Sequence, residues 1–188
     1  MKKLQPILTD SSDFPEIRGN GCVYVDKTAY FHDLITRLDA RRFFLSRPRR
    51  FGKSLMISTL EAIFQGRKEL FDGLAISKTD WKWEKYPVIH FNFINAAAST
   101  VEEFRQLFLL EVKRGITEAG GTFDAQYSAA GNFAMSIDEL SARNDGKGVV
   151  NQLVALPSFY IYNGTDAAVV MFKRRIIKTL TSHPFKQV

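Results

Sequence analysis

The chain has 188 residues, of which 45% are hydrophobic and 13% aromatic, so it can bury the core of one domain and is not a disordered polymer. Its single cysteine excludes an internal disulfide framework and is typical of a reducing, cytoplasmic setting. Its net charge is +6, and no apolar run approaches the length of a signal-peptide core or a membrane span, so we expect no membrane partner.

The first half of the chain reads as a helix, a strand and a second helix. The first helix begins near Asp26, a good N-cap residue, and runs to about Leu38. Residues 43–46 are an apolar run in which we expect a buried strand. The second helix begins at Lys53 and is predicted to end at Gly66, because glycine suits the left-handed turn that follows many helices.

A strand and a helix follow. The strand is predicted over residues 87–94, with proline at its first position. Thr100 and Glu103 have the spacing of a capping box, and the helix that they open is expected to end near Arg114. Residues 115–131 are small and polar and are predicted as a loop. The alternation of strands and helices predicts an α/β fold, a parallel sheet flanked by helices.

The most informative segment lies between the predicted strand at residues 43–46 and the helix after it. Residues 41–53 contain six cations and no acid, and such crowding costs self-repulsion unless an anion binds there. A P-loop reads G-x-x-x-x-G-K followed by Ser or Thr, and it lies between a strand and a helix. The residues in this register are Arg47, Pro48, Arg49, Arg50, Phe51, Gly52, Lys53 and Ser54.

This segment matches the P-loop pattern at every defining position except the first, where Arg47 replaces glycine. Pro48 favours an extended conformation for Arg47, which is a different way of leaving the strand. Gly52 lets the backbone approach phosphates, Lys53 can bridge the β- and γ-phosphates, and the hydroxyl of Ser54 can ligate Mg²⁺. The pattern predicts a site for ATP and Mg²⁺; a basic turn that contains Gly-Lys-Ser by chance is the alternative.

Three stretches of the chain resemble one protein family, the bacterial AAA-ATPase-like proteins. They are VYVDKTAYFHDLI at residues 23–35, FFLSRPRRFGKSLMISTLEAIFQGRKELFDGLAI at residues 43–76 and YPVIHFNF at residues 86–93. The resemblance covers roughly residues 14–115. Members of the family join a P-loop ATPase domain to a C-terminal nuclease-like domain of the PD-(D/E)XK type, and arginine at the first loop position is the family's own version.

The resemblance implies a P-loop NTPase-type sheet, here partial, and nucleotide binding through Gly52, Lys53 and Ser54. It also implies that Asp26 and Lys27 matter to the family. The residues alone assign these two no chemical role, and a helix cap is a sufficient explanation for Asp26.

Hydrolysis requires more than phosphate binding, because a second carboxylate at the end of an apolar strand holds the Mg²⁺ water shell. The only Ile-Asp-Glu lies at residues 137–139. Asp138 is either that acid or, as the capping-box spacing of Ser136 and Glu139 favours, part of the first turn of a helix. Asp166 follows a better strand, but an Asn-Gly turn lies between. The sequence therefore predicts ATP binding without a convincing acid for hydrolysis.

The resemblance is lost after about residue 150. We therefore expect a P-loop domain over residues 1–150 and a tail over residues 151–188 that is apolar and basic, as in a truncated gene product without the nuclease-like domain. Two other functions stay open at this point. In the first, the basic loop contacts the phosphates of a nucleic acid or another polyanion; in the second, the chain is an inactive remnant. The sequence does not predict an oligomeric state.

Overall fold

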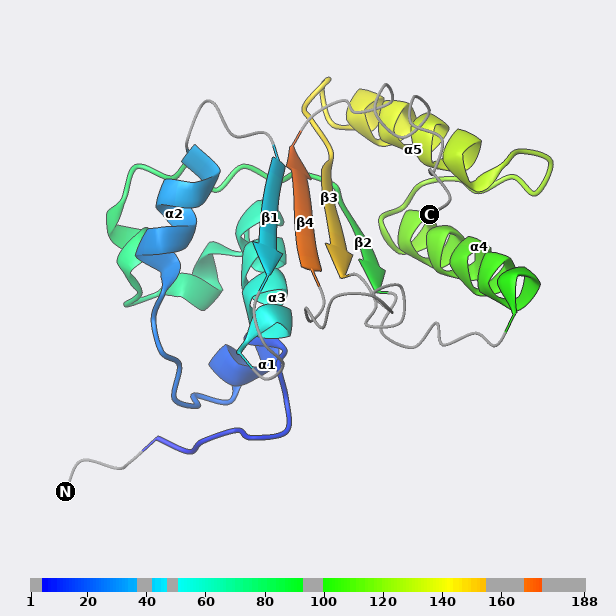
Figure 1. Ribbon diagram of the computed structural model, residues 1–188. Coiled ribbons are helices and arrows are strands. Elements are labelled where there is room, and N and C mark those ends of the chain that lie inside the picture. Colours follow the sequence, from blue (N-terminus) through cyan, green and yellow to red (C-terminus); the bar gives the residue numbers. More distant parts are fainter. Residues whose placement is uncertain (1–4, 37–41, 47–50, 93–99, 155–167, 174–188) are drawn as a thin grey trace. The chain divides into compact units, whose positions relative to one another are not determined.

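The computed structural model describes residues 5–36, 42–46, 51–92, 100–154 and 168–173. The chain divides into two compact units (Figure 1). The first unit comprises Met1–Ala40 and Arg47–Tyr86, and the second comprises Arg41–Ser46 and Pro87–Val188. The predicted boundary at residue 150 stays a prediction.

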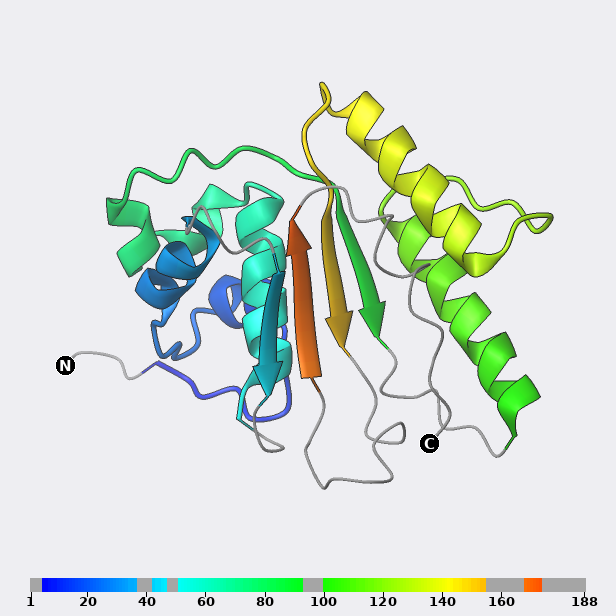
Figure 2. The same ribbon diagram turned by 45° about the horizontal axis from the view of Figure 1, so that its top comes forward.

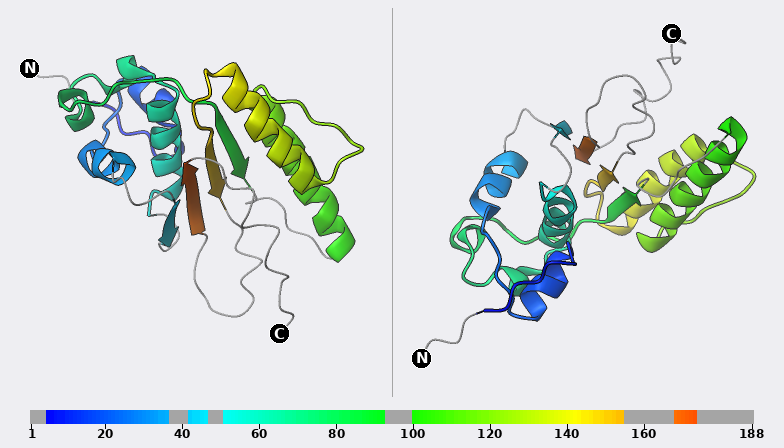
Figure 3. Two further views of the ribbon diagram at one scale, coloured as in Figure 1. Left: turned by 90° about the horizontal axis from the view of Figure 1, so that it is seen from above. Right: turned by 60° about the horizontal axis from the view of Figure 1, so that its bottom comes forward.

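The first unit is helical (Figure 3, right). Helix α3 follows the basic segment and ends as predicted, with Gly66 in the left-handed conformation at φ 69°. Its buried face includes Leu60, Ile63 and Phe64. The elements of the unit are α1 (Phe14–Gly19), α2 (Thr28–Thr36), α3 (Lys53–Phe64) and the 3₁₀ helices η1 (Lys68–Phe71) and η2 (Ala75–Lys78).

The second unit contains a four-stranded sheet in the order β1-β4-β3-β2. Strands β2 and β3 are parallel, so the α/β organisation agrees with the prediction, but β4 runs antiparallel to both of its neighbours. The expected all-parallel sheet is therefore wrong for β4, because antiparallel neighbours require no crossover helix between them. The strands are β1 (Arg42–Ser46), β2 (Val88–Asn92), β3 (Val150–Val154) and β4 (Ala168–Lys173).

The pairing of β4 fixes the directions of the other strands. Because β1 and β3 are both antiparallel to β4, and β2 is parallel to β3, the strands β1, β2 and β3 all run the same way. Their carboxyl ends, at Ser46, Asn92 and Val154, therefore lie at one edge of the sheet. In the sequence, the basic segment follows Ser46, the last residue of β1, directly.

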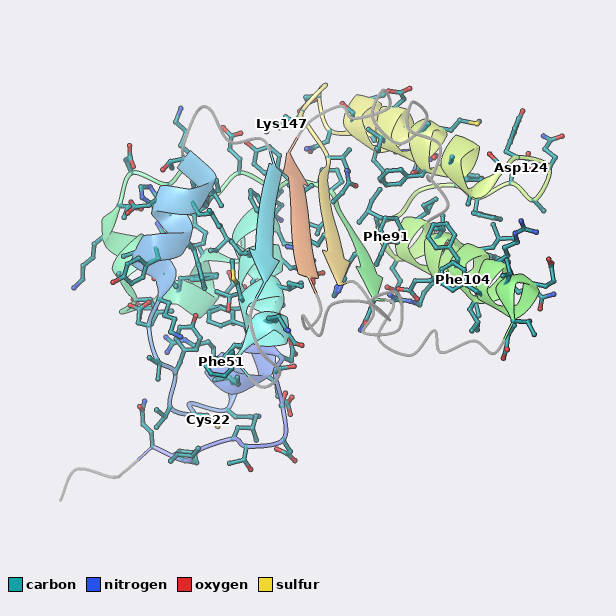
Figure 4. The ribbon with its side chains drawn as sticks, in the orientation of Figure 1. Cys22, Phe51, Phe91, Phe104, Asp124 and Lys147 are labelled. Atoms are coloured by element: carbon teal, nitrogen blue, oxygen red, sulfur yellow. The ribbon has the colours of Figure 1, made fainter. Side chains whose placement is uncertain are left out.

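Helix α4 (Val101–Glu118) begins where its capping box predicts, because the side chain of Thr100 accepts a hydrogen bond from the N–H of Glu103 at 3.1 Å. It packs beside α5 (Ala129–Arg143) along the sheet (Figure 2). Ile89 and Phe91 of β2 share one buried core with residues of both helices, and Figure 4 shows Phe91 between the strand and α4. The residues of this core are Ile89, Phe91, Val112, Ile116, Ile137, Leu140 and Val149.

The loop predicted over residues 115–131 is shorter than expected. Helix α4 continues through Gly115 and Ile116 to Glu118, and α5 begins at Ala129. Glycine lowers helix propensity, but here both Gly115 and Ile116 are buried, and tertiary packing outweighs a local cost of about 1 kcal/mol.

Helix α4 also covers the open edge of β2. The guanidinium of Arg114 donates to the carbonyl oxygen of His90, and Glu111 accepts from the backbone N–H of Asn92. Hydrogen bonds to Glu111 and then Glu118 hold the pKa of Arg114 above its ordinary value, so the guanidinium keeps its charge. An uncovered edge strand would offer unpaired backbone groups to another chain, and these side chains occupy them instead.

Gly115 is the position where α4 approaches β2 most closely. A Cβ atom there would lie 2.8 Å from the carbonyl oxygen of His90 and 2.8 Å from the ring of Phe91. We expect Gly115→Ala to lower the free energy of unfolding by about 1.5 kcal/mol, because overpacking outweighs the gain in helix propensity. Urea denaturation followed by circular dichroism measures this change.

Gly131, in the first turn of α5, is the matched control for this prediction. A Cβ atom at Gly131 would meet only ordinary contacts, at 3.4 Å and 3.5 Å. Gly131→Ala should leave stability unchanged or raise it by roughly 0.5 kcal/mol. Equal changes in the free energy of unfolding for Gly115→Ala and Gly131→Ala would contradict the close approach of α4 to β2 at Gly115.

Candidate functional site

Gly52, one of the predicted nucleotide-binding residues, is the N-cap of α3. It has φ 71° and ψ 26°, the left-handed conformation that a side chain disfavours. Its carbonyl oxygen accepts the first helical hydrogen bond, from the N–H of Met56 at 3.0 Å. Among the described residues, a Cβ atom at Gly52 would meet nothing within 4 Å, so the positive φ is the reason found there for glycine at this position.

The helix begins at Lys53, so both residues of the predicted Lys-Ser pair lie in its first turn. Lys53 is half-buried, and Ser54 is exposed. The side chain of Phe51, labelled in Figure 4, is 60% exposed. Arg47, Pro48, Arg49 and Arg50 lie outside the described residues.

The start of α3 is electropositive. Gly52 has no side chain to cap the helix, and no acidic residue lies in the first turn. The first amide groups of a helix carry the positive end of its dipole, and they attract anions when no side chain neutralises them. The first turn therefore contains backbone N–H groups, one ammonium group and one exposed hydroxyl, which are the kinds of group that bind anions.

The acid predicted for hydrolysis does not lie at the end of a strand. Asp138 is exposed near the middle of α5, so its reading as an acid that follows an apolar strand is wrong and the helical reading is correct. The helix nevertheless starts earlier than predicted, with Ser128 accepting from the N–H of Gly131 at 3.1 Å. Asp166 lies outside the described residues.

Ser136 and Glu139 do not form the expected capping box, because both lie inside α5. The hydroxyl of Ser136 donates to the carbonyl oxygen of Phe133 at 2.9 Å. Glu139 accepts from the N–H and the hydroxyl of Thr122, both at 2.8 Å, and these bonds lower its pKa. Capping-box spacing occurs by chance inside amphipathic helices, and here the earlier Ser128 supplies the real cap.

Asp26 ties the start of α2 to the 3₁₀ segment near residue 75. Its Oδ1 atom accepts from the N–H and the hydroxyl of Thr28, at 2.8 Å and 2.7 Å, which agrees with the predicted cap. Its Oδ2 atom accepts from the N–H of Ala75 at 2.7 Å, and the hydroxyl of Thr28 accepts from the N–H of Ile76 at 3.0 Å. Sequence spacing gave no signal for these two contacts across nearly fifty residues.

Lys27 contributes through its backbone. Its carbonyl oxygen accepts from the N–H groups of Tyr30, at 3.1 Å, and Phe31, at 3.3 Å, which starts α2. The Lys27 side chain is exposed. The structure thus gives both residues of this Asp-Lys pair a part in starting α2.

The pKa of Asp26 predicts how stability changes in acid. Partial burial would raise this pKa, but the hydrogen bonds from Thr28 and Ala75 lower it below its ordinary value. The stability that the carboxylate contributes is therefore present above the unfolded-state pKa and lost as pH falls through the lowered folded-state value. We expect the stability difference between the parent and Asp26→Asn to shrink below about pH 4. Urea midpoints from pH 7 to pH 3 measure it, and a difference independent of pH would refute the assignment.

The described residues lack the features of two other kinds of site. No group of three or more His, Cys, Asp or Glu side chains in this part of the chain is placed to hold a metal ion. Within the same residues, no helix combines the length and the apolar character needed to cross a membrane.

Comparisons with known proteins agree with the motifs. The profile of a family described as "Predicted AAA-ATPase" matches residues 9–153, which is most of the chain. A protein of Azotobacter chroococcum mcd 1, described as "Uncharacterized protein in vnfD 5'region", is 44% identical over 82 residues, which are 43% of this chain and 15% of that protein. No solved structure matches the chain. Because the family profile spans more than half of its residues, the chain belongs to the predicted AAA-ATPase family.

Proposed function

We propose that this chain binds ATP with Mg²⁺ through residues 47–54, the P-loop of its family. One observation carries the proposal: a left-handed Gly52 forms the N-cap immediately before Lys53 and Ser54, which open α3. Membership of a predicted ATPase family supports it independently. So does the order of elements along the chain, since the segment follows strand β1 and precedes helix α3, as a P-loop does.

The residues in the first turn of α3 have chemistry that suits a magnesium–triphosphate. The backbone N–H groups after Gly52 donate to phosphate oxygens, and the ammonium of Lys53 balances their charge. The hydroxyl of Ser54 is exposed and provides a hard oxygen ligand of the kind that Mg²⁺ prefers. Bound Mg²⁺ would neutralise phosphate charge, while these groups would hold and orient the triphosphate.

The proposal is for binding and does not extend to turnover. Asp138 is excluded as the strand-end acid because it lies in α5, and no other described residue has been assigned that part. Phosphate binding and water activation are separate tasks in P-loop proteins. A chain that has the phosphate-binding residues but lacks the residue that activates water would bind ATP and release phosphate slowly.

Calorimetry of the purified chain with Mg·ATP, followed by a phosphate-release assay, tests both parts. We expect saturable one-site binding that weakens when EDTA removes Mg²⁺, together with little phosphate release. Ser54→Ala should reduce the effect of EDTA, because the Mg²⁺ ligand is gone. Absence of saturable binding would refute the proposed function, and rapid release would show that an acid not identified here completes the site.

A further inference from the structure

Ser58 of α3, the helix that carries Lys53 and Ser54, is hydrogen-bonded to Asp13 and Phe14 of the N-terminal segment. We call these two hydrogen bonds the clasp. The hydroxyl of Ser58 accepts from the backbone N–H of Phe14 at 2.9 Å and donates to Oδ1 of Asp13 at 2.8 Å. One hydroxyl group therefore bonds to the carboxylate of Asp13 and to the backbone N–H of Phe14, two neighbouring residues that are distant from Ser58 in the sequence. Both its donor and its acceptor capacity are used, so the bridge fixes the orientation of the hydroxyl.

The clasp also completes the start of α1. Asp13 is the N-cap of that helix, yet its own side chain makes no capping hydrogen bond. Ser58, from α3, supplies the acceptor that the first N–H of α1 requires. Loss of the hydroxyl would leave this N–H without its partner, and it would release the carboxylate of Asp13. Hydrogen bonds between the start of α1 and Ser58 thus join α1 to α3.

Aromatic packing and a second hydroxyl contact reinforce the clasp. Phe14 is fully buried, and its ring lies 5.0 Å from that of Tyr24 and 4.7 Å from that of Phe71, centroid to centroid. The hydroxyl of Tyr24 lies 3.4 Å from Oγ1 of Thr59, the residue of α3 that follows Ser58. Two successive residues of α3 are therefore held from the same N-terminal segment.

The position of the clasp on α3 connects it to the phosphate-binding turn. Ser58 lies four residues after Ser54, so the two side chains are neighbours on one face of the helix. A helix turn is a rigid unit, and a rotation at Ser58 would turn the amides and the hydroxyl of the first turn away from a bound phosphate. Phosphate sites lose affinity when such groups are displaced by small distances.

We propose that Asp13 and Ser58 are positioning residues for the phosphate-binding turn, and this inference rests on the proposed function. Neither residue contacts the phosphates; both act through the orientation of α3. No local sequence pattern indicates this pair, because Asp13 and Ser58 are separated by 45 residues. The N-terminal segment is therefore a functional part of the nucleotide site.

Two measurements on the full chain test the inference. The first is hydrogen exchange of the Met56 amide, which donates to the carbonyl oxygen of Gly52 and so reports on the first turn without nucleotide. The second is the Kd for Mg·ATP. For Ser58→Ala we expect exchange faster, and binding weaker, by about two- to tenfold, the equivalent of one net hydrogen bond. Asp13→Asn, which keeps an acceptor oxygen, should change both less than Asp13→Ala.

Ser77→Ala is the matched control, because it removes a hydroxyl that donates to the carbonyl oxygen of Leu74 at 2.6 Å, within η2 of the same unit. This variant should leave the exchange of Met56 and the Kd unchanged. Equal effects of Ser58→Ala and Ser77→Ala would overturn the inference. If the parent chain does not bind Mg·ATP, the proposed function fails, and the exchange comparison alone then decides whether the clasp orders α3.

Discussion

Lys53→Ala should weaken the binding of Mg·ATP by roughly a hundredfold, which corresponds to about 3 kcal/mol. Lys53 is in the first turn of α3, directly after the left-handed Gly52, and its ammonium is the one charged side chain of the Gly-Lys-Ser triplet. Charge-assisted hydrogen bonds to phosphate are the strongest single contacts that such a turn can make. Isothermal titration calorimetry of the parent and the variant measures the difference.

Lys78→Ala is the matched control for this prediction. Lys78 is exposed in η2 of the same unit, so its removal makes the same change in net charge. Under the proposed function this control binds Mg·ATP as the parent does. If the chain instead binds polyanions without a defined site, each substitution should lower the salt dependence of DNA binding by about one counterion. In that case Lys53→Ala should weaken the binding of Mg·ATP no more than Lys78→Ala does.

Gln152→Leu should raise the free energy of unfolding by about 2 kcal/mol, although it removes a polar residue from a natural sequence. Gln152 lies in the middle of β3 and is 0% exposed. Among the described residues, neither Nε2 nor Oε1 of its amide has a hydrogen-bond partner. Leucine has a similar volume and no polar atom to leave unsatisfied, so the substitution removes a desolvation cost without leaving a large cavity. Urea denaturation measures the gain.

Gln65→Leu provides the comparison for this core substitution. The amide of Gln65 donates to Oε1 of Glu61 at 3.0 Å and is only partly buried. Its replacement should give no gain in stability, because a satisfied hydrogen bond is lost. A loss of stability in Gln152→Leu would show that the buried amide has a partner that compensates for its burial.

The sequence predicted well those elements that carry local signals. Gly66 ends α3 in the left-handed conformation, and Thr100 caps α4, because glycine and a capping hydroxyl act on their own immediate backbone. The Gly-Lys-Ser triplet likewise lies at a helix start, where its pattern places it. Asp138 lies in a helix, as the sequence favoured, but well inside α5 and not in the predicted first turn.

The features that the sequence did not predict depend on distant contacts. The helical state of Gly115 comes from its packing on β2, which outweighs the propensity that indicated a loop. Strand β3 contains Asn151 and Gln152, both buried. Because these two residues are polar, β3 lacks the continuous apolar run that predicts a buried strand. The direction of β4 follows from its pairing with β1, more than a hundred residues earlier in the chain.

The most direct test of the account is an amide-resolved NMR titration of the chain with Mg·ATP. If residues 47–54 hold the triphosphate, the amide resonances of Gly52, Lys53 and Ser54 should shift together, with the same Kd as calorimetry gives. In Lys53→Ala the remaining shifts should need a roughly hundredfold higher Mg·ATP concentration. Saturable binding that leaves these three resonances in place, while others move, would contradict the account.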